Sequence, residues 1–138
     1  TVEEIRKHLE NGQALAKFEE MVAAQGGDLE DLYRPVNVAH VVEIPAQETG
    51  VISALPAMEF GLYAMRLGAG RAVKSDDLDY ETGIVFEKKV GDSVQKGEIV
   101  AKVYTNGKIS SELVTEFQKY VKINDGVQSL REIIEIIS

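Results

Sequence analysis

The chain has 138 residues, of which 44% are hydrophobic and 28% charged, and it contains no cysteine. This length and composition are typical of a globular protein with one core and exclude disulfides, thiolate metal sites and cysteine nucleophiles. With 15 basic and 23 acidic side chains the formal net charge is −8, which opposes binding to nucleic acid. The longest uninterrupted apolar runs are Met21 to Ala24 and Leu62 to Met65, far shorter than the roughly 20 residues of a membrane span. We therefore expect neither nucleic acid nor a membrane as a partner.

The N-terminal residues 1–27 are predicted to form a helical hairpin. Thr1 and Glu4 have the spacing of a capping box, and Asn11-Gly12 supplies a stop after the first helix. A second apolar stripe at helical spacing then ends at Gly26-Gly27. Because the chain starts with Thr directly at a helix, we expect it to be a fragment of a longer polypeptide.

Residues 28–37 are predicted to be a linker, since they are acidic and end in Arg34-Pro35-Val-Asn. From residue 38 the period of the hydrophobic pattern changes to that of strands. Residues 38–44 and 50–55 are two short β-rich runs separated by Pro45 and a polar turn, which indicates a hairpin or a bent strand pair.

A helix is predicted over residues 57–67, with Pro56 at its first position and Gly68 as its stop. A loop follows to residue 82. Strands are expected over 82–88 and 99–104, with Gly91 and Gly97 at the turns between them, and then a helix that is capped by Ser110 or Ser111 and ends near residue 120. Residues 127–138 fit a helix or a closing strand, and their β-branched side chains favour the strand.

Two segments of this loop invite a ligand-binding interpretation. Gly68-Ala-Gly70-Arg71 could cradle a phosphate, but a helix precedes it and Val73 replaces the third glycine of a dinucleotide fingerprint, so a helix stop and turn is favoured. The carboxylates of Asp76, Asp77, Asp79 and Glu81 fail the calcium-loop pattern, which favours a solvated acidic loop that pairs with Arg71 or Lys74.

Neither of the two histidines indicates a metal site. His8 and His40 both lack the Glu-x-x-His spacing of a metal-binding helix. A nucleophilic serine has no Gly-x-Ser-x-Gly elbow to present it. The sequence therefore identifies no catalytic, substrate-binding or metal-binding residue.

Residues 90–100 resemble the turn-and-strand signature of biotinyl and lipoyl carrier domains, and residues 45–52 resemble the other half of such a barrel. A carrier must present a modified lysine on a hairpin tip. Here the corresponding region is Tyr104-Thr-Asn-Gly-Lys108, which lacks the sequence context of those families. The resemblance therefore implies a barrel-sandwich-hybrid-like β core and leaves Lys108 as a turn lysine.

A more specific resemblance runs from about residue 10 to 105. Its segments are Ala14 to Asp28, Gly61-Leu-Tyr-Ala-Met-Arg-Leu-Gly-Ala-Gly-Arg71, Asp79-Tyr-Glu-Thr-Gly-Ile84 and Lys89-Val-Gly-Asp-Ser-Val-Gln-Lys-Gly97. Together they resemble the C-terminal third of pyrimidine-nucleoside phosphorylases of the thymidine phosphorylase family. The resemblance implies an α+β fold in which residues 1–27 end an all-α, dimer-forming domain and residues 38–138 form an α/β domain.

This family implies reversible phosphorolysis, in which a pyrimidine nucleoside and phosphate give the free base and (deoxy)ribose 1-phosphate. The family's phosphate segment, base-binding residues and potassium site match nothing in this sequence and are expected upstream. The resemblance thus implies an inactive C-terminal fragment of a cytoplasmic, homodimeric phosphorylase, with no cofactor in this chain. The alternative is a free-standing biotinyl- or lipoyl-like binding or carrier module.

Overall fold

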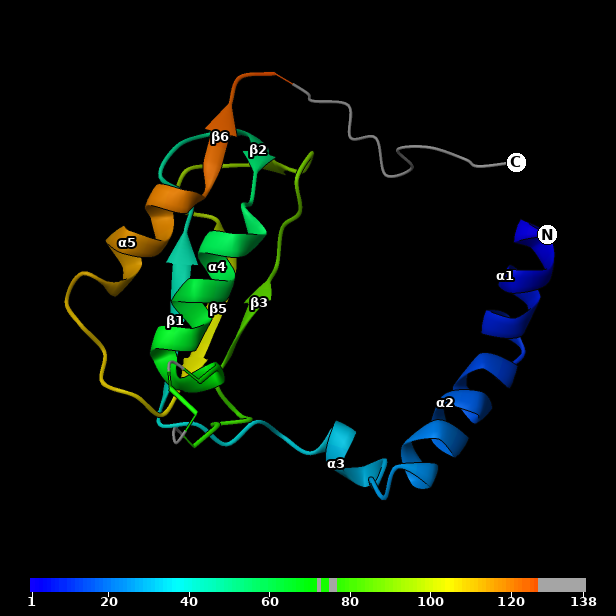
Figure 1. The fold of residues 1–138 in the computed structure, drawn as a ribbon. Helices are drawn as coiled ribbons and strands as arrows, with labels where there is room; N and C mark the ends of the chain where they lie inside the picture. Colours follow the sequence, from blue (N-terminus) through cyan, green and yellow to red (C-terminus); the bar gives the residue numbers. More distant parts are fainter. Residues whose placement is uncertain (72, 75–76, 127–138) are drawn as a thin grey trace. The chain divides into compact units, whose positions relative to one another are not determined.

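A computed structural model of the chain describes residues 1–71, 73–74 and 77–126, and the chain divides into two compact units (Figure 1). The first unit is Thr1–Val36, and the second begins at Asn37. The predictions for Asp76 and for residues 127–138 lie outside the described residues.

The first unit contains helices α1 (Val2–Glu10), α2 (Gln13–Ala24) and the single turn α3 (Glu30–Tyr33). The predicted capping box is confirmed, because the backbone N–H of Glu4 donates to Thr1 Oγ1 and the Glu4 carboxylate accepts from the N-terminal ammonium group. Both helix ends predicted at glycines are also confirmed, with Gly12 at φ 82° and Gly26 at φ 79°. The four-residue α3 was not predicted within the linker.

The hairpin predicted for α1 and α2 is wrong. Figure 1 shows α2 continuing beyond α1 around a bend at Asn11-Gly12, instead of folding back alongside it. Antiparallel helices need a shared apolar seam, whereas neither helix has a fully buried residue and Ile5, Leu9 and Leu15 remain exposed. The two predicted helices are thus present, but they do not fold back on each other.

The described residues of the second unit form two three-stranded antiparallel sheets. In the first sheet β5 (Ile99–Thr105) lies between β1 (His40–Pro45) and β3 (Gly83–Phe86). In the second sheet β2 (Gly50–Ala54) lies between β4 (Ser93–Val94) and β6 (Lys122–Asn124). The β1–β2 hairpin alternative is therefore wrong, since the two strands belong to different sheets and pair with strands far away in the sequence.

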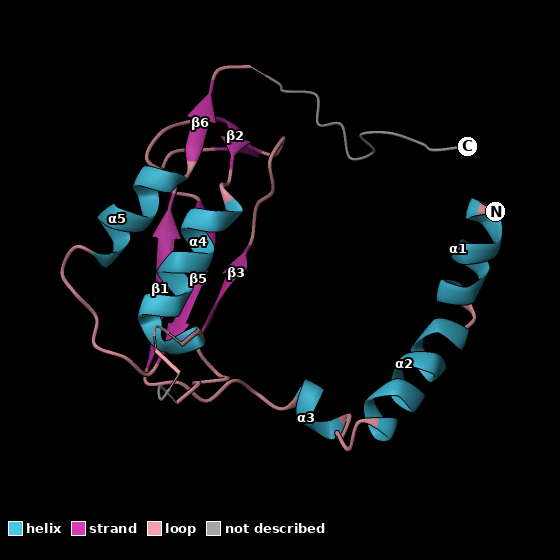
Figure 2. Ribbon diagram, viewed as in Figure 1, coloured by secondary structure: helices cyan, strands magenta, loops and turns pink. Residues whose placement is uncertain are grey.

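The helices α4 (Ala57–Ala64) and α5 (Leu113–Tyr120) lie side by side against the first sheet (Figure 2). Phe60 of α4 and Phe117 of α5 meet with their ring centroids 4.8 Å apart. They pack with Ile44 and Val103, which the sheet contributes to the buried core. The α+β class is thereby confirmed, and the alternating apolar residues of the strands explain which face of the sheet the helices cover.

Two helix ends differ in detail from the prediction. Pro56 precedes α4 as its N-cap rather than as its first residue, and α4 continues into a π-helical turn, η1 (Met65–Ala69). The predicted serine cap of α5 is wrong, because the residue before the helix is Glu112 and it makes no side-chain capping hydrogen bond. Ser110 contributes only its carbonyl oxygen, which accepts from the backbone N–H of Leu113.

Candidate functional site

The glycine-rich segment of the sequence analysis begins inside η1 and continues into the loop that follows it. Gly68 has φ 112°, which confirms the positive-φ conformation expected of a helix stop. Here the backbone presents carbonyl groups: Leu67 O accepts from Thr105 Oγ1 at 3.2 Å, and Gly68 O accepts from the N–H of Asp79 at 3.1 Å. A phosphate is favoured at a helix N-terminus and disfavoured near such a C-terminal end. The geometry therefore favours the structural interpretation of Gly68 to Arg71.

The acidic part of the loop is organised around Asp79. Its carboxylate accepts hydrogen bonds from Thr82 Oγ1 at 2.7 Å, from Asn106 Nδ2 at 2.9 Å and from the backbone N–H of Glu81 at 3.0 Å. These donors, Thr82 foremost and then Asn106, hold the pKa of Asp79 below its ordinary value. The amide oxygen of Asn106 in turn accepts from the N–H of Ala39 at 2.8 Å. We call Asp79, Thr82 and Asn106 the Asp79 network; it joins the loop before β3 to the loop after β5 and, through Ala39, to the segment before β1.

The ion pair expected for Arg71 is not formed with Asp77 or Asp79. Arg71 and Asp77 are exposed, and within the described part of the chain neither Asp77 nor Asp79 pairs with Arg71. Asp79 does not pair with Arg71 because neutral donors already occupy its carboxylate oxygens. Sequence distance alone could not reveal Asn106 as a partner, since it is 27 residues away.

The remaining candidates lie apart from this loop. His8 lies on α1 beside a shallow hollow of about 410 Å³, lined mainly by the apolar side chains of Ile5, Leu9 and Ala14. His40 is exposed at the start of β1, opposite Thr105. Among the residues that the structure describes, no three His, Asp or Glu side chains come together in a way that could hold a metal ion.

Lys108 is exposed in the loop between β5 and α5. A carrier lysine is instead presented between two strands of a tight hairpin. The position of Lys108 between a strand and a helix therefore gives no support to the carrier interpretation.

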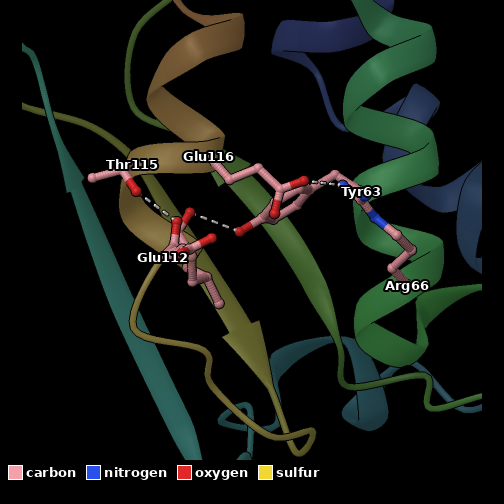
Figure 3. A network of polar contacts seen from close by, with 6 residues as sticks. Tyr63, Arg66, Glu112, Thr115 and Glu116 are labelled. Atoms are coloured by element: carbon pink, nitrogen blue, oxygen red, sulfur yellow. Dashed lines mark hydrogen bonds and ion pairs between the residues drawn. The ribbon is translucent and has the colours of Figure 1, made fainter.

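A polar cluster that the sequence analysis missed joins α4 and η1 to α5 (Figure 3). The Tyr63 hydroxyl donates to the carbonyl oxygen of Leu113 at 3.0 Å, and Arg66 Nη2 lies 2.7 Å from Glu116 Oε1. The Arg66 guanidinium also lies 5.5 Å from the centroid of the Tyr63 ring. The only sign of this cluster in the sequence is that Tyr63 and Arg66 are three residues apart, which places them on the same face of a helix.

The electrostatics of this cluster keep Tyr63 neutral. Its side chain is only 3% exposed. Burial raises the pKa of Tyr63 to about 12; the negative charge of Glu116 adds to the rise, and the positive charge of Arg66 opposes it. A phenol with such a pKa is unsuited to act as a base near neutral pH, so the cluster serves to fasten the two helices together.

In the described parts of the chain, these polar contacts hold loops and helices in place and do not bring a set of reactive groups together. No helix within the described ranges is long and apolar enough to cross a membrane.

Comparison with known proteins supplies a family. The profile described as "Pyrimidine nucleoside phosphorylase C-terminal domain" matches residues 51–124, more than half of the chain. The pyrimidine-nucleoside phosphorylase of Bacillus subtilis (strain 168) is 40% identical over 130 residues, which cover 89% of this chain and 30% of that protein. The Geobacillus stearothermophilus pyrimidine-nucleoside phosphorylase is 35% identical over 123 residues, 87% of this chain and 28% of that protein. The chain thus spans less than a third of the length of these relatives.

Proposed function

Since the chain belongs to the pyrimidine nucleoside phosphorylase family, we propose that it is the C-terminal part of an enzyme that carries out phosphorolysis of pyrimidine nucleosides. The substrates are a pyrimidine nucleoside and phosphate, and the products are the free base and ribose or deoxyribose 1-phosphate. The match of the C-terminal-domain profile to residues 51–124, from β2 to β6, carries this proposal.

We assign this chain a structural role in that reaction and no catalytic residue. Phosphorolysis depends on holding phosphate below the anomeric carbon and on stabilising the departing base anion. The polar groups described above form structural hydrogen bonds instead. The Asp79 carboxylate accepts three hydrogen bonds that organise a loop, and the Tyr63 hydroxyl links two helices. We therefore propose that the positioning groups lie in the remainder of the enzyme and that the chain alone is inactive.

We propose a cytoplasmic homodimer, with the two sheets of the second unit arranged as a barrel-sandwich hybrid. A potassium ion, if the whole enzyme uses one, is assigned to residues outside this chain, because the described side chains offer it no cluster of carboxylates.

The test is a chimera in which this chain replaces the matching segment of the Bacillus subtilis enzyme, assayed for release of uracil from uridine. We expect phosphate-dependent release from the chimera and none from the chain alone. A folded chimera without activity would refute the assignment to this enzyme, and activity of the chain alone would refute its structural role.

An intact mass measured after expression with biotin and lipoyl ligases tests the carrier alternative, which requires an adduct on a lysine.

A further inference from the structure

Helix α4 is apolar around almost its whole circumference. Phe60 and Tyr63 are buried on its inner side, 5% and 3% exposed. On the outer side Met58 is 77% exposed and Leu62 is 51% exposed, four residues apart and therefore on one face of the helix. A helix that is apolar on all sides is normally covered on all sides.

The neighbouring helix α5 gives an internal comparison. It has the same length as α4 and contributes Phe117 to the same core. Its exposed side chains include Thr115 and Lys119, which are polar. The outer face of α5 is thus suited to water, whereas that of α4 is not.

Gly61 supplies an independent observation on the same outer face. It lies within α4, its φ is not positive, and a Cβ added there would meet nothing within 4 Å. Glycine in a helix interior lowers helix stability relative to alanine, and neither strain nor crowding within the described structure requires it here. A glycine next to Met58 and Leu62 allows the backbone of another element to approach closely.

The two charged residues of this helical stretch lie to one side of that face. Arg66 is turned toward Glu116 of α5, and Glu59 occupies the same edge at helical spacing. A partner of the outer face therefore needs an apolar surface and no complementary charge.

We propose that the outer face of α4, formed by Met58, Gly61 and Leu62, packs against an apolar helix in the remainder of the phosphorylase. This inference rests on the proposed function. The chain covers only 30% of the Bacillus subtilis relative, so a surface provided by the rest of that enzyme is the occupant that the length comparison favours. The face is then an internal domain interface that anchors this part of the enzyme.

The absence of cysteine from the sequence makes a direct test possible, because one introduced thiol is unique in the isolated chain. Leu62→Cys is prepared in the isolated chain and in the chimera, and its rate of alkylation is followed by peptide mass spectrometry. Lys119→Cys on α5 is the matched control. We expect alkylation of Leu62→Cys to be at least about tenfold slower in the chimera, with the Lys119→Cys rate nearly unchanged. Met58→Cys replaces Leu62→Cys if that chimera does not fold.

Equal rates for the outer-face thiol in the isolated chain and in the chimera would overturn the proposal. Protection in the isolated chain that increases with protein concentration would also overturn it, because a second copy would then be the occupant. The alkylation rates do not depend on catalysis, so an inactive chimera that protects Leu62→Cys would refute the proposed function and leave this interface intact. An active chimera in which the Leu62→Cys thiol stays reactive would refute this interface and leave the proposed function intact.

Discussion

The hydroxyl of Tyr63 provides the sharpest test of how α4 and α5 are held together. It is buried, and it donates a hydrogen bond of 3.0 Å to the carbonyl oxygen of Leu113. Tyr63→Phe removes this bond with little change in the shape of the ring. A net loss of about 1 kcal/mol in the free energy of unfolding is expected near neutral pH, which is equivalent to roughly 4–8 °C in Tm for a domain of this size.

The same substitution should lose its effect at alkaline pH. The pKa of Tyr63 is raised from 10.0 in the ordinary case to about 12 in the folded chain. Between these values the unfolded chain has released the proton while the folded chain retains it, so the stability of the wild type falls by about 1.4 kcal/mol per pH unit. The Tyr63→Phe variant has no hydroxyl to titrate at this position, so its stability does not fall for this reason. The wild type should therefore be the more stable protein at pH 8, and the two should become equal near pH 11.

Urea unfolding of both proteins at several pH values between 8 and 11 measures this difference. Other titrating groups are common to both chains and cancel in the comparison. Tyr80→Phe is the control, because Tyr80 is 89% exposed and its hydroxyl contributes no buried hydrogen bond. A stability difference for Tyr63→Phe that stays constant over this range would show that the raised pKa is wrong, and no difference at pH 8 would show that the hydrogen bond contributes nothing.

Features that depend on neighbouring residues could be predicted from the sequence. The capping box of Thr1 and Glu4 and the helix stop at Gly68 both arise from the conformational preferences of adjacent residues. The apolar side of α5 was also predictable, since Leu113 and Phe117 are one helical turn apart and both are buried.

Features that depend on distant pairing could not be predicted. Strand β1 pairs with β5, which lies more than 50 residues further along the chain, so proximity in the sequence wrongly suggested β2 as its partner. The Asp79 network likewise needs Asn106, whose distance from the loop is set by the sheet. The glycine-rich segment was recognised from the sequence as a helix stop and turn, and the structure adds a second reason to disfavour phosphate, because the Leu67 and Gly68 carbonyl groups accept hydrogen bonds there.

Further substitutions test the core, the Asp79 network and the glycine loop. Phe117→Ala should lower the free energy of unfolding by about 3–5 kcal/mol in urea titrations, because Phe117 is 0% exposed among three other aromatic rings; an effect below 1 kcal/mol would contradict this packing. Since the pKa of Asp79 is lowered, its stabilising contribution is present above the ordinary value of 3.8 and is lost as the pH falls below it, so the stability advantage over Asp79→Asn should shrink on acidification. Gly68→Ala should cost about 1–2 kcal/mol because φ is 112°, while Gly83→Ala, at negative φ and in open space, should cost little. If the glycine loop is purely structural, Arg71→Ala in the chimera should leave the KM for phosphate nearly unchanged. A rise of about tenfold at unchanged Tm, equivalent to about 1.4 kcal/mol of lost binding, would instead place the guanidinium of Arg71 at the substrate.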